Sequence, residues 1–137
     1  MKAASSSTPL VGADGTPLGI TLGQWQQAAG TVTFTCEGSK LLAASTLTGL
    51  IPSATYSTFV VHAQRDGPKL FTPWVDRAGT SNDFTASATG TASPTSTVHG
   101  CSSADVIIIW HSDGKTHGKS PGQIGVDWHT TLIARVS

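Results

Sequence analysis

Hydrophobic and polar residues alternate along much of the chain, with the period of two that is typical of β-strands. In residues 31–36 (TVTFTC), the apolar side chains fall on one side of a strand and the threonines fall on the other. Residues 41–47 and 55–62 follow with further strand-like segments, and the second ends at His62. The pattern predicts half-buried antiparallel strands over these three segments.

Residues 106–109 (VIII) give the strongest strand signal in the chain. A short β-branched run without polar interruption predicts a strand that is buried on both faces. Aromatic and histidine side chains flank or occupy the Gly-, Pro- and Ser-rich loop that follows: Trp110, His111, His117, Trp128 and His129. A last apolar segment, residues 131–136, predicts the closing strand.

Turn and loop signals divide the remaining sequence. Residues 14–17 (DGTP) predict a turn, and residues 20–25 are compatible with a short strand after it. Residues 63–82 contain two prolines, two glycines and charges of both signs. This composition predicts a long ordered loop, and loops of this length in compact domains are usually functional or disordered.

Residues 84–88 and 91–98 predict a tight hairpin, in which Pro94 places the second arm at a sheet edge or a bulge. The chain therefore predicts about eight short strands and no convincing amphipathic helix. This spacing is typical of an all-β fold, either a Greek-key β-sandwich or a flattened eight-stranded β-barrel. We expect a single domain over residues 18–137, preceded by a flexible tether over residues 1–17.

Charge and hydropathy exclude two classes of partner. Eight basic and eight acidic residues give a formal net charge of +0, and only 12% of residues are charged. We expect no nucleic-acid partner, because the chain has no basic face, and no membrane insertion, because no apolar run is long enough. The opening MKAASSSTP is typical of a mature secreted chain without its signal segment, which predicts an extracellular or periplasmic location.

Two cysteines, Cys36 and Cys101, predict one structural disulfide formed in an oxidising compartment. Closing a loop of about 65 residues would stabilise the fold by about 4 kcal/mol on the loop-entropy model. Two buried free thiols are the alternative. The chain has no C-x-x-C pair, so neither thioredoxin-like redox chemistry nor a cysteine zinc site is supported.

The order of several short segments resembles the copper/zinc superoxide dismutase family. That family has a G-L-x-P-G turn before an F-H-V-H strand, then an H-F-N-P loop, a G-N-x-T-A strand and a V-V-H-E strand. The matching segments here are GTVTF (30–34), LTGLIP (47–52), FVVH (59–62), LFTP (70–73), NDFTA (82–86) and IIWH (108–111). The resemblance implies a Greek-key barrel over most of the chain.

The resemblance also implies a reduced metal site. His62 takes the place of the second histidine of F-H-V-H, and His111 takes that of V-V-H-E; both are copper ligands in the family. Val60 and Leu70 occupy the positions of two other copper ligands, and Asp83 is a loose match to the zinc-site aspartate. We therefore expect the scaffold without dismutase activity.

Histidines from separate segments are predicted to meet at one end of the fold. His62, His111 and His129 would form the core of the site, with His117 as a fourth ligand from the loop. Imidazole nitrogen suits copper and zinc, and the resemblance favours copper over zinc. The side chains expected to support these ligands are Asp113, Asp127 and Trp110. The alternative is that these histidines are solvated surface residues.

Two further classes of function remain open. Trp74 and Trp128 could form aromatic platforms for a glycan or protein partner in a metal-free extracellular binding module. A self-assembling extracellular structural subunit would instead use edge strands and the N-terminal tether. Hydrolase chemistry has little support, because the chain shows no Ser-His-Asp order and has only one glutamate, Glu37.

Overall fold

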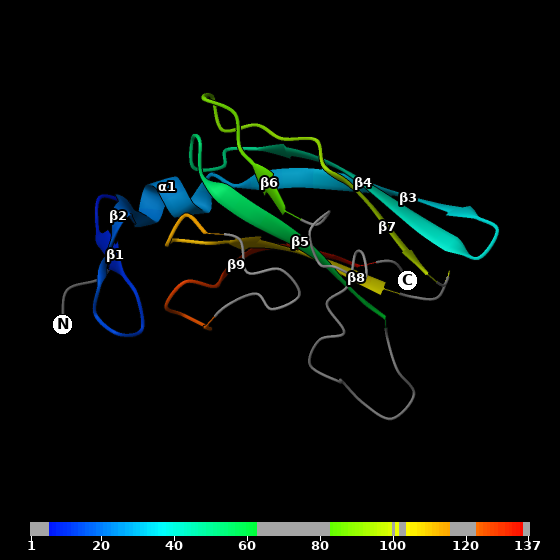
Figure 1. Cartoon of the computed structure of the whole chain (residues 1–137). Coiled ribbons are helices and arrows are strands. Elements are labelled where there is room, and N and C mark those ends of the chain that lie inside the picture. The colour runs from blue at the N-terminus through cyan, green and yellow to red at the C-terminus, as the bar shows by residue number, and fades with distance from the viewer. Residues whose placement is uncertain (1–5, 63–82, 100, 102–103, 116–122, 136–137) are drawn as a thin grey trace.

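The computed structural model describes residues 6–62, 83–99, 101, 104–115 and 123–135, which form an antiparallel β-sandwich (Figure 1). One sheet has the strand order β3-β4-β7, the other has the order β6-β5-β8-β9, and β1 and β2 form a separate hairpin. The predicted all-β fold is confirmed. The elements are β1 (Pro9–Val11), β2 (Pro17–Thr21), α1 (Leu22–Gln26), β3 (Ala29–Glu37), β4 (Lys40–Thr48), β5 (Thr55–His62), β6 (Asp83–Thr85), β7 (Thr95–His99), β8 (Ala104–Trp110) and β9 (His129–Arg135).

The two sheets follow the general plan of a Greek-key sandwich rather than a closed barrel. β3 and β9 approach each other at one side, but no hydrogen-bonded ladder joins them among the described strands. β6 pairs with β5 and β7 pairs with β4, so the predicted hairpin between β6 and β7 is wrong. The turn between them instead packs on another part of the chain, because Leu50 N donates a hydrogen bond to the Gly90 carbonyl (2.9 Å).

The main core lies between the sheets and follows directly from the alternation in the sequence. Along β4, buried and more exposed positions alternate. The facing sheet contributes inward residues from β5 and β8 with the same period. Buried members of the main core include Leu41 and Leu47 from β4, Tyr56 and Val60 from β5, and Val106, Ile108 and Trp110 from β8.

The opposite, outer face of the four-stranded sheet is buried as well. Phe59, Ile109 and Trp128 form a second cluster there, with Ile107 packed against it. Phe59 and Ile109 are completely inaccessible to solvent. The prediction that residues 106–109 form a strand covered on both faces is therefore confirmed.

The N-terminal region differs from the expected tether. β1 pairs with β2, and Leu22 N donates a hydrogen bond to the Thr8 carbonyl (2.8 Å). Leu10 and Leu18 pack against the main core, so burial holds the chain in place from residue 6 onward. Helix α1 also replaces part of the strand predicted over residues 20–25.

A capping box starts this helix. Gln24 N donates to Thr21 Oγ1 (3.3 Å), and Thr21 N donates to Gln24 Oε1 (2.8 Å). The T-x-x-Q spacing that makes these two bonds is visible in the sequence and is a helix-start signal. The strand predicted over residues 20–25 overlooked this helix-start signal.

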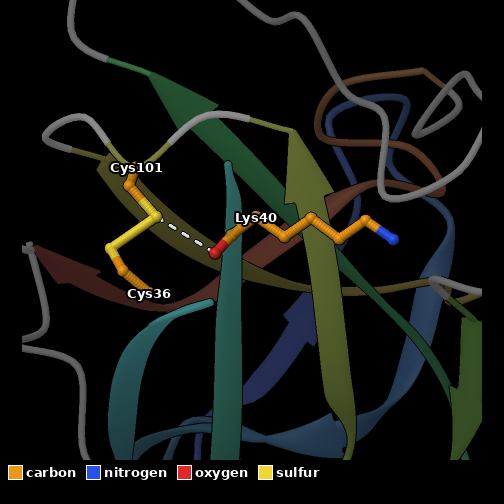
Figure 2. Close-up of a disulfide and its surroundings, with 3 residues drawn as sticks. All are labelled: Cys36, Lys40 and Cys101. Atoms are coloured by element: carbon orange, nitrogen blue, oxygen red, sulfur yellow. Dashed lines mark hydrogen bonds between the residues drawn. A yellow bond between two sulfur atoms is a disulfide. The ribbon is translucent and has the colours of Figure 1, made fainter. Parts of the chain in front are cut away.

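The predicted disulfide joins Cys36, at the end of β3, to Cys101, just after β7 (Figure 2). Their Cα atoms are 5.9 Å apart. β4 lies between β3 and β7, so the bond ties the two outer strands of this sheet across the central one. The Lys40 carbonyl oxygen lies 3.0 Å from Cys101 Sγ. A disulfide sulfur carries no hydrogen, so this is a close polar contact without a donated proton.

Candidate functional site

Three polar side chains meet on the outer face of the four-stranded sheet. Ser57 from β5 donates a hydrogen bond to Asp83 Oδ1 from β6 (2.5 Å), and its Oγ lies 2.6 Å from His111 Nε2 at the exit of β8. Ser57 and His111 are each only 1% exposed. We call Ser57, Asp83 and His111 the buried polar triad.

The proton count within the triad fixes the role of His111. A serine hydroxyl has one hydrogen, and Ser57 gives it to the Asp83 carboxylate. His111 Nε2 must therefore carry a hydrogen and donate it to Ser57 Oγ. In this arrangement His111 does not act as a base toward Ser57, and its Nε2 is not available as a metal ligand. The triad is a structural connection between three strands.

His129 lies on the opposite, inner face of the same sheet. It is the register partner of Trp110, and the two rings are 5.1 Å apart, while Trp25 contacts the histidine edge-on at 6.2 Å. Ser112 Oγ donates to the Val126 carbonyl (2.8 Å), so His129 Nε2 donates to Ser112 Oγ (2.9 Å) and toward the same carbonyl (3.2 Å). His129 thus connects the two ends of the loop between β8 and β9.

Burial lowers the pKa of His129 below its ordinary value, because the partly desolvated ring is harder to charge. The hydrogen bond to Val126 and the negative charge of Asp127 act in the opposite direction and reduce the shift. Near neutral pH, His129 is therefore uncharged. Because β9 begins at His129, the strand carries no charge at its first residue near neutral pH.

The pH dependence of stability is expected to report this shift. Folded His129 binds its proton less tightly than the unfolded chain, so the unfolded state takes up more protons as pH falls below about 6.5. Stability is therefore fully present above this value and declines below it. In His129→Gln this share of the loss disappears, so the drop in melting temperature between roughly pH 7.5 and pH 5 becomes smaller than in the wild type.

The other four histidines provide the internal control, because they contribute equally to both proteins. A direct measurement is the NMR titration of the His129 ring. Protonation of this ring at or above the ordinary histidine pKa would contradict the expectation.

The structure does not bring the predicted metal ligands together. His62 pairs with Ala104, whereas Trp110, the neighbour of His111, pairs with Tyr56 six residues away along β5. At about 3.3 Å per residue, His62 and His111 leave opposite ends of the ladder, about 20 Å apart. The strands are antiparallel, so their carboxyl ends point in opposite directions, which the motif comparison could not reveal.

His111 and His129 are also separated, because they lie on opposite faces of the sheet. Within the described residues, no three side chains of the metal-ligating types are placed to hold one ion. His117 and Trp74 lie outside the described residues. The copper or zinc site therefore stays a prediction.

The predicted supporting residues have local structural roles. Asp113 Oδ1 accepts from Lys115 N (3.0 Å), and Asp127 Oδ1 accepts from Gln123 N (2.5 Å), so each carboxylate holds a turn. Trp110 packs against His129. Trp128 is only 8% exposed and packs on Phe59 and Ile109, so little of its ring is available to a ligand.

One side of the sandwich remains open, between the outer edges of β3 and β9. β9 is an edge strand of seven residues, and no described strand pairs with its outer edge. A small apolar cavity of ≈ 60 Å³ lies between the two strands, lined by Gly30 and Val32 from β3 and by Leu132, Ile133 and Ala134 from β9. Ile133 is 62% exposed. We call β9, β3 and this cavity the open edge.

β9 is less protected against strand addition than the edge strands β6 and β7, although it ends at the charged Arg135 and its register with β8 shifts between Ile108 and Ile109. Proteins protect sheet edges with short strands, charged residues, prolines or bulges. β6, the other edge of the same sheet, has three residues and starts with Asp83, and β7 follows Pro94 directly. By contrast, β9 carries no proline or glycine and no acidic residue.

Comparisons with known proteins do not assign the chain to a family. No family model, curated protein or solved structure matches the chain. None of the helices in the described residues has the length and apolar character needed to cross a membrane. The observations available for function are therefore the sandwich, its disulfide and the open edge.

Proposed function

We propose that this protein is an extracellular interaction domain that binds an extended segment of a protein partner along the open edge. The observation that carries the proposal is the outer edge of β9, with which no strand in the described part of the chain pairs and on which Ile133 is exposed. A bound strand would satisfy the outward backbone groups of β9 and cover the apolar cavity beside β3. The disulfide supports an oxidising, extracellular compartment.

The chemistry of the polar residues supports binding over catalysis. The hydroxyl of Ser57 is inaccessible and engaged with Asp83 and His111. His129 is engaged with the loop that precedes it. His111 and His129, two of the predicted metal ligands, therefore stabilise the fold, while the open edge has no structural partner among the described strands.

A capped peptide of alternating threonine and valine tests the proposal. Added to dilute, ¹⁵N-labelled protein, it is expected to shift the amide signals of β9 and β3 and to slow hydrogen exchange of the outward β9 amides. The matched control is the same peptide with a central proline, which removes one donor from the ladder and should bind much more weakly. Equal effects of both peptides, or shifts confined to other strands, would contradict strand addition.

A further inference from the structure

We propose that the partner strand is β9 of a second copy of this chain, which pairs antiparallel with its counterpart across a two-fold axis. This inference rests on the proposed function, because it names the occupant of the open edge. A two-fold contact is self-complementary, so each favourable feature of the edge acts twice. Antiparallel pairing of identical strands is the simplest contact of this type.

The composition of β9 suits pairing with itself. If the axis passes near Leu132, then Thr131 of one copy lies opposite Ile133 of the other. β-branched residues in opposite positions stabilise antiparallel pairs. In the dimer, the exposed Ile133 side chain of each copy would lie beside β9 of the other copy and lose contact with water.

Charge favours the same partner. Between Thr130 and Ala134 the strand has no ionisable side chain, and with the axis near Leu132 its one charged residue, Arg135, lies opposite His129 of the other copy rather than opposite the second Arg135. Self-pairing of this stretch therefore places no like charges opposite each other. The whole chain has a formal net charge of +0, so two copies do not repel each other at long range. A charged partner segment would find no complementary charge on this stretch of β9.

Sedimentation velocity of the complete chain, from dilute solution up to about 1 mM, tests the inference. We expect a concentration-dependent dimer for the wild type, and a monomer at every concentration for Ile133→Lys. Two exposed apolar residues outside the open edge provide matched controls, Val11 (60% exposed) and Ile124 (69% exposed). Val11→Lys and Ile124→Lys should dimerise like the wild type.

Hydrogen exchange identifies the surface that is covered. In the wild type, the outward amides of β9 should become protected as concentration rises, and in Ile133→Lys they should stay unprotected. The melting temperature of monomeric Ile133→Lys should equal that of the dilute wild type, because the residue is exposed in a single copy. This measurement separates loss of the dimer from loss of the fold.

Three outcomes would overturn the inference. They are a wild type that is monomeric at the highest concentration, a dimer that survives Ile133→Lys, and a dimer that is lost in a control variant instead. The peptide experiment separates this failure from that of the proposed function. If the wild type stays monomeric but the threonine–valine peptide protects β9, only self-pairing is overturned. If the peptide also fails, both proposals are overturned.

Discussion

The double variant Cys36→Ser/Cys101→Ser is expected to lose about 4 kcal/mol of unfolding free energy, with a melting temperature lower by about 10–15 °C. The disulfide closes a loop with a sequence separation of 65, which contains β4, β5, β6 and β7. Removing it lets the unfolded chain explore many more conformations. It also frees the outer strands of the three-stranded sheet from each other (Figure 2).

Urea denaturation of the oxidised wild type, the reduced wild type and the double variant measures this effect. Reduced wild type and double variant should agree closely, because both cysteines are exposed and serine fits either site without a new cavity. A double variant within about 1 kcal/mol of the oxidised wild type would contradict the expectation. A reduced wild type as stable as the oxidised protein would contradict it independently.

The strands were predictable because their side chains alternate. The predicted segment 55–62 coincides with β5, and the uninterrupted run at residues 106–109 lies within the doubly covered strand β8. The disulfide was predictable from the presence of two cysteines. These features depend on local pattern and composition, and a single sequence contains that information.

The sheet to which each strand belongs, and the direction in which it runs, were harder to predict from the sequence. The turn at Thr89 and Gly90 is compatible with a hairpin, but its docking against Leu50 sends β6 and β7 to different sheets. The placement of His62 depends on β5 and β8 running in opposite directions, and this arises from long-range packing. The candidate metal site depends on the same long-range arrangement, since it requires the ends of two strands to lie close together, and His62 and His111 lie at opposite ends of the β5–β8 ladder.

The buried residues show why a histidine motif is a weak guide to function. His111 was predicted as a ligand, yet it is 1% exposed and bonds to a serine on the neighbouring strand. The relevant partner, Ser57, is an ordinary strand residue in the sequence, and Asp83 lies 26 residues further along the chain. Only the register of β5 with β6 and β8 brings these residues together.

Ser57→Ala is expected to lower the unfolding free energy by about 2 kcal/mol, because it leaves a half-buried carboxylate and a buried imidazole without their shared hydroxyl. His111→Ala should cost more, about 3–4 kcal/mol, since it also leaves a cavity. The double variant Ser57→Ala/His111→Ala should lose less unfolding free energy than the sum of the two single losses, with a coupling of about 1 kcal/mol. Denaturation at constant pH measures all three values.

Ser45 provides the matched control, because it is a buried serine on the inner face of β4 whose hydroxyl has no hydrogen-bond partner among the described residues. Ser45→Ala removes a polar atom from the core without breaking a bond, so stability should stay the same or rise slightly. If Ser57→Ala and Ser45→Ala have equal effects, the triad contributes nothing specific to stability.

The same variants test the metal hypothesis against the structural role of His111. If His111 only donates to Ser57, excess copper or zinc leaves the difference in melting temperature between wild type and His111→Ala unchanged. If it is a ligand, added metal raises the melting temperature of the wild type and not that of the variant, because only the native wild type binds. The short distance between His111 Nε2 and Ser57 Oγ (2.6 Å) favours the first result. A metal ion at Nε2 would displace the hydrogen on which the triad depends.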